Sequence, residues 1–257
     1  MNCVFITMKG SFRSWGTTSV GDDRETDLFP TASAVLGLAG ACMGVDLHSK
    51  EQVKSWYSGF HVVTLSAVSY LRTKPNERHP IYNPSLLVDF HTISDSLTMG
   101  GTTKNDSVLS YRNYITDALD VAVIIARHED ANNWLGQLAM ALHQPRFTPY
   151  LGRRCNPLST PLAEPNETMI WIDSIEEVTD RMFLRLTKLS IADLKPYQCC
   201  LRVSNDLESN SNRLKEKWSY KKTEFVADQR TGAFRTFENR KIHLYTRYIS
   251  QRGDSDV

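Results

Sequence analysis

The sequence lacks long apolar runs and lacks the cysteine pattern of a secreted protein. Its 257 residues contain no apolar stretch near the ~20 residues that a membrane-spanning helix needs. The first apolar stretch ends at Lys9-Gly10, which is too early for a signal peptide. The five cysteines are an odd number without a C-x-x-C pair, which argues against a complete disulfide framework. We therefore expect reduced, mostly buried thiols in a cytoplasmic protein that has no membrane partner.

Recognised catalytic and metal-binding motifs are also absent. The seven histidines show no H-x-x-x-H or H-E-x-x-H spacing, so no metal site is predicted. The sequence has no G-x-S-x-G motif, and its glycine-rich stretch at 37–44 lacks the Gly-Lys-Ser/Thr of a phosphate-binding loop. We expect no cofactor and no catalytic residue.

One segment has no acidic residue at all, from position 141 to position 163. Four prolines within it, at 145, 149, 157 and 161, exclude a regular helix or a central strand, because proline fixes φ and removes a backbone donor. The candidate binding residues in this stiff loop are Arg146, Tyr150, Gly152, Arg153 and Arg154. Arginines bind phosphates, rings stack on bases, and a glycine admits close backbone approach. The segment therefore predicts a site for an anion with flat rings; the alternative is a structural loop whose arginines pair with carboxylates of the body.

The net charge is only +1, so bulk charge does not indicate a nucleic-acid partner. The distribution of charge is more informative. Residues 213–252 hold eleven Lys and Arg against four Asp and Glu, so positive charge is concentrated there as well as in the loop.

The periodicity of apolar residues predicts an α+β fold. Strands are expected at 2–10, 60–73, 85–93, 108–115 and 116–128, and helices at 30–44, 50–59 and 129–144. Thr31 is the expected N-cap of the first helix, whose glycines predict close packing against another backbone. Residues 11–29 are predicted to form a long loop, and Gly100-Gly101 predicts a hairpin turn. This order suggests a split βαβ unit with an inserted hairpin.

Several motifs occur together in a recognisable order. They are SFRSWG (11–16), FPTASAVLGLAGACMG (29–44), DFHTI (89–93), YRNYITDALDVAVII (111–125), PRFTPYLGRRCNPLSTPL (145–162) and GAFRTFENRKIHLYT (232–246). At this spacing the sequence resembles the CasD-type subunits of type I-E CRISPR Cascade complexes. The resemblance covers most of residues 1–162 and a patch near the C-terminus, whereas residues 163–231 match poorly.

The resemblance implies a ferredoxin-like (RRM-type) domain at 1–162 with a protruding thumb hairpin near 85–115. A smaller, β-rich C-terminal extension, 163–257, would close the same domain. The implied function is non-catalytic: the protein would grip the 5′ handle of the CRISPR RNA in antiviral defence. Implied partners are the backbone subunit, through the thumb, and the large subunit, while target DNA is met only through the complex.

The resemblance also adds candidate RNA contacts outside the loop. They are Arg13 and Trp15 after the first strand, His91, Lys104, Tyr111 and Arg112 on the thumb, and Arg235 near the C-terminus.

Two other functions stay open. One is a metal-independent endoribonuclease that matures the precursor RNA, for which His91 is the plausible acid or base. Because Asp89 and His91 lie two apart in a strand, they should point to the same side, and Asp89 is the expected structural acceptor for His91. The other is a protein-interaction module that touches RNA only weakly.

Overall fold

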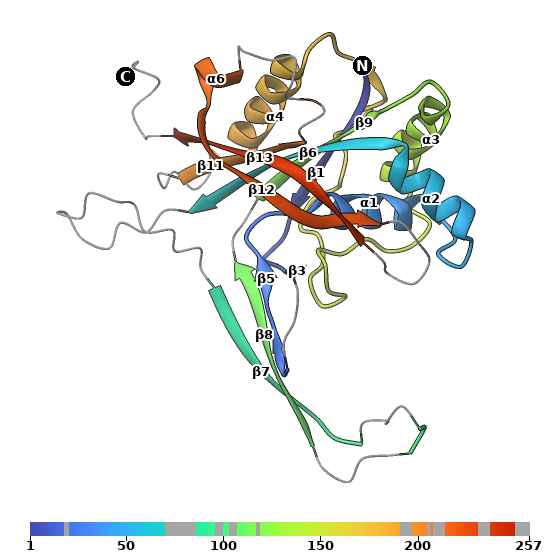
Figure 1. Cartoon of the computed structure of the whole chain (residues 1–257), viewed down its shortest axis with the longest axis vertical. Helices are drawn as coiled ribbons and strands as arrows, with labels where there is room; N and C mark the ends of the chain where they lie inside the picture. The colour runs from blue at the N-terminus through green and yellow to red at the C-terminus, as the bar shows by residue number, and fades with distance from the viewer. Residues whose placement is uncertain are drawn as a thin grey trace, which may run out of the picture.

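The computed structural model describes residues 1–17, 21–69, 86–95, 100–102, 107–116, 119–190, 197–204, 207, 214–230 and 237–249. Within them, a seven-stranded sheet forms the centre of the molecule (Figure 1). In spatial order its strands are β10 (Ile170–Trp171), β1 (Asn2–Lys9), β9 (Leu119–Ala126), β6 (Phe60–Ser69), β11 (Tyr197–Ser204), β13 (Phe237–Ile249) and β12 (Ser219–Arg230). All neighbouring strands are antiparallel.

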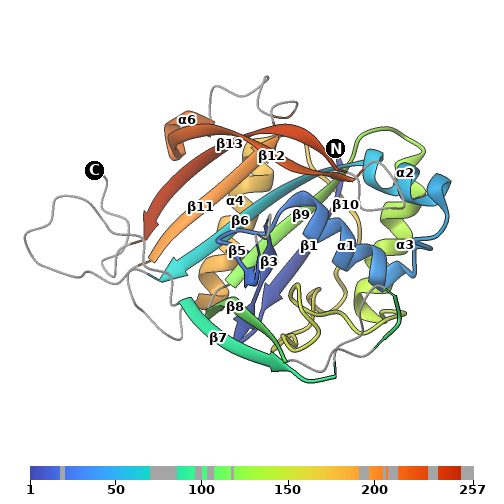
Figure 2. The ribbon, with the colours of Figure 1, turned by 60° about the horizontal axis from the view of Figure 1, so that its bottom comes forward.

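Both faces of this sheet are covered. The helices α1 (Ala32–Met43), α2 (Lys50–Ser58) and α3 (Ala131–His143) pack on the face that presents Val4, Ile6 and Met8. Helix α4 (Ile175–Ser190) packs on the opposite face, which presents Cys3 and Phe5 (Figure 2). Strands that are buried on both faces are largely apolar, which is why β1 and β9 do not alternate; the exception in β9 is the buried Asp120.

Helix α1 begins and ends as its sequence predicts. The Thr31 side chain accepts a hydrogen bond from the Ala34 amide at 3.2 Å, and Gly44 ends the helix in the left-handed conformation. A Cβ on Gly40 would lie 3.2 Å from the Trp56 indole nitrogen, which donates to the Leu36 carbonyl at 2.9 Å. Close packing at this helix is confirmed, but the neighbour is an indole ring of α2 rather than a backbone.

A hairpin, here called the thumb, is inserted between β6 and β9, which pair with each other in the main sheet. Its strands are β7 (Leu86–Ile93) and β8 (Val108–Thr116), and it projects away from the body (Figure 1). Both strands match the predicted ranges. Gly101 has a φ of 77°, as a hairpin turn requires, while residues 96–99 and 103–106 of the tip lie outside the described residues.

Residues 11–29 are not the simple loop that the sequence predicts. They contain β2 (Phe12–Arg13), β3 (Trp15–Gly16), β4 (Asp23–Arg24) and β5 (Thr26–Asp27). Strands β2 and β4 both pair with β8, and β3 pairs with β5. The pairings with β8 join residues roughly 90–100 positions apart, so local composition does not reveal them.

The C-terminal residues extend the central sheet. Strand β10 adds to one edge and β11, β13 and β12 add to the other, while the short helix α6 (Leu214–Lys217) precedes β12. In the chain, α4 lies between β10 and β11, and its Val178, Met182 and Leu186 are fully buried against the sheet. The expected boundary at residue 162 stays a prediction. No helix among the described residues is long and apolar enough to span a membrane.

Candidate nucleic-acid interface

The acid-free segment forms a compact, internally bonded loop, which we call the basic loop (145–157). Tyr150 and Pro157 form an isolated β-bridge, and the Leu151 amide donates to the Asn156 carbonyl at 2.9 Å. The Asn156 side chain, which is buried, returns a hydrogen bond of 3.0 Å to the Leu151 carbonyl. Leu151 itself is fully buried in the main core. These bonds hold the loop rigid before any ligand arrives, which lowers the entropic cost of binding.

The packing of the loop requires a glycine at position 152. Its φ is +85°, and a Cβ there would lie 1.7 Å from the Ser14 carbonyl oxygen. Its amide donates within the loop, to the Tyr150 carbonyl at 3.1 Å. The glycine therefore lets the loop lie directly against the backbone of Ser14, while close approach of the loop backbone to a phosphate stays a prediction.

Arg153 ties the basic loop to the base of the thumb. Its guanidinium lies over the Tyr114 ring at 4.6 Å and donates to the Arg24 carbonyl at 2.9 Å. Tyr114 belongs to β8 and Arg24 to β4. The Nη1 atom of Arg153 is buried without a hydrogen-bond partner in the described part of the chain. Arg153 thus has a structural role in addition to the anion binding predicted from the sequence.

Arg146 and Arg154 are exposed. The Arg146 amide donates to the Cys42 carbonyl at 2.9 Å, and its side chain lies over Gly44, at the carbonyl end of α1 where a cation is favoured. Among the described residues, Arg154 has neither a hydrogen-bond nor an ion-pair partner. The alternative predicted from the sequence is that carboxylates of the body pair with the arginines of this loop. Among the described residues, no carboxylate pairs with Arg154.

Two surface hollows adjoin the loop. One, of about 490 Å³, runs along Ser14, Trp15, Ser33 and Tyr57, and the other, of about 470 Å³, is lined by Phe147, Arg154 and Pro157. Tyr150, which is 38% exposed, lines both. A hollow with rings and an unpaired guanidinium has the groups that an unstacked nucleotide needs.

Arg13 and Trp15 are interior residues, each 1% exposed, and their expected contact with RNA stays a prediction. Arg13 forms an ion pair with Asp120 and donates to the Leu28 carbonyl at 2.6 Å. Asp120 also accepts from the Trp15 indole at 3.4 Å and from the Ser66 hydroxyl at 2.5 Å. The arginine is buried because it satisfies a carboxylate that the sheet itself buries. A lone acidic residue inside the apolar run of β9 was the signal that the sequence analysis missed.

The thumb residues serve the hairpin itself. The His91 ring is hydrogen-bonded to Asp89, so the predicted structural acceptor is confirmed. The Tyr111 ring lies 5.2 Å from that of Phe90, and the Arg112 side chain donates to the Ser110 hydroxyl at 3.3 Å. Lys104 and Arg235 lie outside the described residues.

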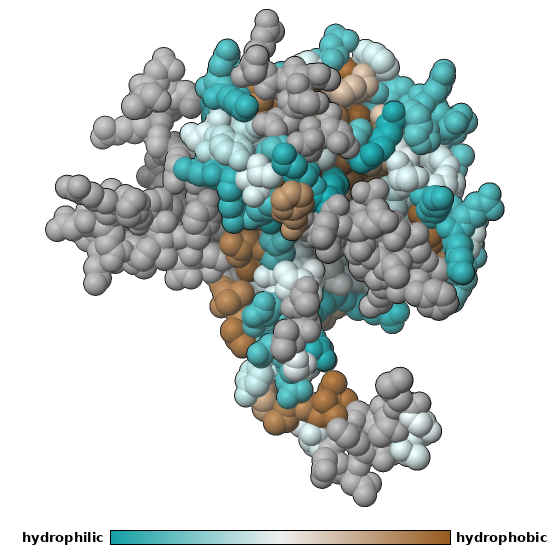
Figure 3. Space-filling view, in the orientation of Figure 1, coloured by the Kyte–Doolittle hydropathy of each residue, from teal (hydrophilic) through white to brown (hydrophobic). Residues whose placement is uncertain are grey.

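One face of the thumb is apolar and exposed, a feature that the sequence analysis also missed. Opposite residues of an antiparallel pair share a face, so the register places Leu86, Val88, Phe90, Leu109 and Tyr111 together. Their exposed fractions range from 42% to 54%. Figure 3 shows hydrophobic residues following one side of the thumb. Exposed apolar patches of this kind mark interaction surfaces.

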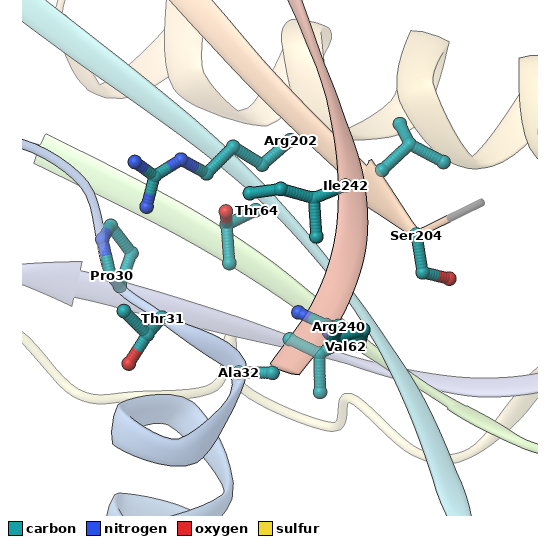
Figure 4. A pocket seen from close by; sticks show the side chains of 10 residues that line it. Pro30, Thr31, Ala32, Val62, Thr64, Arg202, Ser204, Arg240 and Ile242 are labelled. Carbon is teal, nitrogen blue, oxygen red and sulfur yellow. The ribbon is translucent and has the colours of Figure 1, made fainter. Parts of the chain in front are cut away.

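Other candidate sites are weaker. The described residues contain no group of His, Cys, Asp and Glu that could hold a metal ion. The hollow between the start of α1 and the strands β11 and β13, where Arg202 and Arg240 lie, measures about 10 Å³, room for about one water (Figure 4). The Arg202 guanidinium there is paired with Asp27 at 3.1 Å. This hollow is a packing gap.

The five cysteines are free thiols, and four of them are buried, as expected. Burial raises the pKa of Cys3 to about 12 and that of Cys42 to about 11. Burial also raises the pKa of Cys199. These thiols stay protonated near neutral pH and are unsuited to nucleophilic or redox chemistry.

Comparison with known proteins gives concordant results. The family model for CRISPR-associated protein (Cas_Cas5) matches residues 3–237. The chain is 29% identical over 161 residues to the CRISPR system Cascade subunit CasD of Escherichia coli (strain K12), covering 62% of this chain and 68% of that protein.

Solved structures share the fold at low identity. A chain of a CRISPR RNA-guided surveillance complex superposes with a TM-score of 0.58 at 17% identity, covering 97% of this chain and 91% of that one. The crystal structure of a Cas protein superposes with a TM-score of 0.53 at 19% identity, covering 96% and 93%. The resemblance seen in the sequence motifs is confirmed. The chain belongs to the Cas5 family of CRISPR-associated proteins.

Proposed function

We propose that this protein is a non-catalytic subunit of a type I Cascade complex and grips the 5′ handle of the CRISPR RNA with its basic loop. The observation that carries the proposal is the exposed, unpaired Arg154 beside Phe147 and Tyr150 on a rigid loop without acidic residues. Single-stranded RNA needs cations for its phosphates and rings for its unstacked bases. Membership of the Cas5 family and similarity to CasD support this assignment.

The arrangement of strands supports a ferredoxin-like core. In chain order the core elements are β1, α1, β6, β9, α3 and β10, and the sheet order β10-β1-β9-β6 is that of a split βαβ unit. An RRM presents a sheet face to RNA. Here α1 and α3 cover one face and α4 covers the other. The proposed RNA contact is therefore displaced from the sheet to the basic loop.

The remaining assignments follow from the family and from the thumb. We propose that the apolar face of the thumb packs on a neighbouring protein subunit, the backbone subunit, and that the large subunit docks nearby. Target DNA is reached only through the complex, and the complex works in the cytoplasm. We also propose that residues 163–257 close the same domain as residues 1–162, which is supported by the continuation of the central sheet in β10, β11, β13 and β12.

The decisive experiment is a binding titration with a matched charge reversal. Fluorescence anisotropy measures the affinity of the purified chain for the labelled repeat-derived 5′ segment of the guide RNA at several salt concentrations. Arg154→Glu should weaken binding and make the slope of log K against log salt shallower by about 0.7, because one phosphate contact is lost. Lys188→Glu reverses a positive charge in the same way at an exposed residue of α4, away from the loop, and should leave the slope of log K against log salt unchanged. Equal effects of the two variants would refute a specific role for the loop.

A further inference from the structure

Tyr150 stands between two hollows of different chemistry. Its ring and the neighbouring Ala41 and Pro149 line both of them. The bridge to Pro157 and the hydrogen bond from the Gly152 amide fix the backbone of Tyr150. Each hollow lies within the range of about 300–1,000 Å³ that small-molecule sites occupy. The two hollows therefore adjoin each other at these three shared residues, of which only Tyr150 carries an aromatic ring.

The first hollow, which we call the hydroxyl hollow, is rich in hydrogen-bonding groups. Ser14, Thr31, Ser33 and Tyr57 line it. The hydroxyl of Thr31 is used as the N-cap of α1, and that of Ser14 lies 3.2 Å from the Asn113 carbonyl. Ser33, whose hydroxyl lies 3.1 Å from that of Thr31, is only partly buried. A hydroxyl both donates and accepts, so Ser33 can bond the edge of a base.

The second hollow, the aromatic hollow, is built for stacking. Its lining is Ala41, Phe147, Thr148, Pro149, Tyr150, Arg154 and Pro157. Rings, proline faces and a guanidinium plane bind the face of any base and carry little information about its identity. Arg154, which lines this hollow and is unpaired among the described residues, offers a positive charge to a phosphate.

We propose, resting on the proposed function, that two successive nucleotides of the bound RNA are unstacked and parted by the Tyr150 ring. One base enters the hydroxyl hollow, where Ser33 contributes to base selection. Its neighbour enters the aromatic hollow and is held by stacking without base selection. The prediction is a sharp step in specificity between two adjacent positions of the handle.

The test is a scan of the repeat-derived 5′ RNA segment with the full chain. Each position in turn is replaced by 2-aminopurine, whose fluorescence reports loss of stacking on neighbouring bases, and separately by each of the four bases. Two adjacent positions should change fluorescence on binding, and only one of them should discriminate among bases. Fluorescence changes at no adjacent pair, or equal base discrimination at both positions, would overturn the proposal.

Variants assign the two positions to the hollows. Tyr150→Ala should weaken binding about tenfold or more and abolish both fluorescence changes, since stacking on an aromatic ring contributes on this scale. Tyr150→Phe should retain both. Ser33→Ala should remove base discrimination at one position and leave the adjacent position unaltered. Thermal unfolding of each variant verifies that the loop is intact.

Failure of this inference is distinguishable from failure of the proposed function. If Arg154→Glu weakens binding but Tyr150→Ala does not, the loop binds RNA and the partition by Tyr150 is wrong. If neither variant changes the affinity, both proposals fall.

Discussion

The basic loop and the thumb are neighbours with opposite chemistry. The loop is charged, compact and held by its own hydrogen bonds. The thumb is a long hairpin whose exposed face carries Val88, Phe90 and Tyr111. They meet where Arg153 lies over Tyr114. The difference is what the proposed function requires, with a polyanion at the loop and a protein at the thumb.

The two regions also differ in what keeps them folded. An isolated two-stranded hairpin is marginally stable in water. Among the described residues, the thumb is supported by β2, which pairs with its base at 115–116, and by β4, which pairs halfway along β8 at 111–112. The loop instead inserts Leu151 into the main core. We therefore expect damage to the shared base to affect both regions, and damage to either outer surface to affect only its own partner.

The largest effect is expected beneath both regions, at the Arg13–Asp120 ion pair. Asp120→Asn leaves the Arg13 charge buried without a counter-charge, which should lower the free energy of unfolding by about 3–5 kcal/mol. Urea denaturation measures it. Asp180→Asn removes a carboxylate from the exposed pair with Lys217 and should cost less than about 1 kcal/mol. Equal losses of unfolding free energy in the two variants would show that the buried Arg13–Asp120 pair is no more important for stability than an exposed pair.

An intermediate effect on stability is expected at Arg153, which joins the basic loop to the thumb. Arg153→Ala removes the contact with Tyr114 and the hydrogen bond to the Arg24 carbonyl, a loss of about 1–2 kcal/mol. Because it loosens the loop from the thumb, it should lower both RNA affinity and assembly with partner subunits. Arg154→Ala should lower RNA affinity alone and leave the unfolding free energy unchanged. If the two variants behave alike in all three measurements, Arg153 does not join the regions.

A smaller change in stability is expected on the thumb face. Phe90 is 53% exposed, so Phe90→Ser should change the unfolding free energy by less than about 1 kcal/mol. Its effect should appear in co-purification with partner subunits, whose yield should fall while RNA affinity holds. Leu47, 50% exposed on the body, provides a matched control, and Leu47→Ser should assemble normally. Normal assembly of the Phe90 variant would remove the thumb face as a docking surface.

No effect at all is expected in a cleavage assay. His91 is hydrogen-bonded to Asp89 on the face opposite Phe90, and we expect neither the native protein nor His91→Ala to cut labelled precursor RNA in EDTA. A general acid or base would contribute about 10²–10⁴-fold. Site-specific cleavage by the native protein that His91→Ala loses would establish the nuclease alternative.

Local pattern predicted the parts of the fold whose residues determine their own environment. Thr31 and Gly44 mark the ends of α1 by capping chemistry, and the apolar runs of β1 and β9 indicate buried strands. The pairings of β2 and β4 with β8 and the second covered face depend on distant partners, and no local pattern encodes them.

The site was predictable in composition but not in the role of each residue. The absence of acidic residues correctly placed the arginines on an unusual loop. It could not distinguish Arg153, which is stacked on a ring from β8, from Arg154, which is unpaired. The burial of Arg13 was not predictable from the sequence, because its counter-charge, Asp120, is 107 positions away.

The most direct test of the division between loop and thumb is photo-crosslinking of the bound guide RNA. Photoreactive uridine is placed in the 5′ segment, and the crosslinked peptides of the assembled protein are mapped by mass spectrometry. We predict crosslinks at Phe147 and Tyr150, which lie at the two hollows. Crosslinks confined to the thumb face, at Phe90 and Tyr111, would contradict the assignment of RNA to the basic loop.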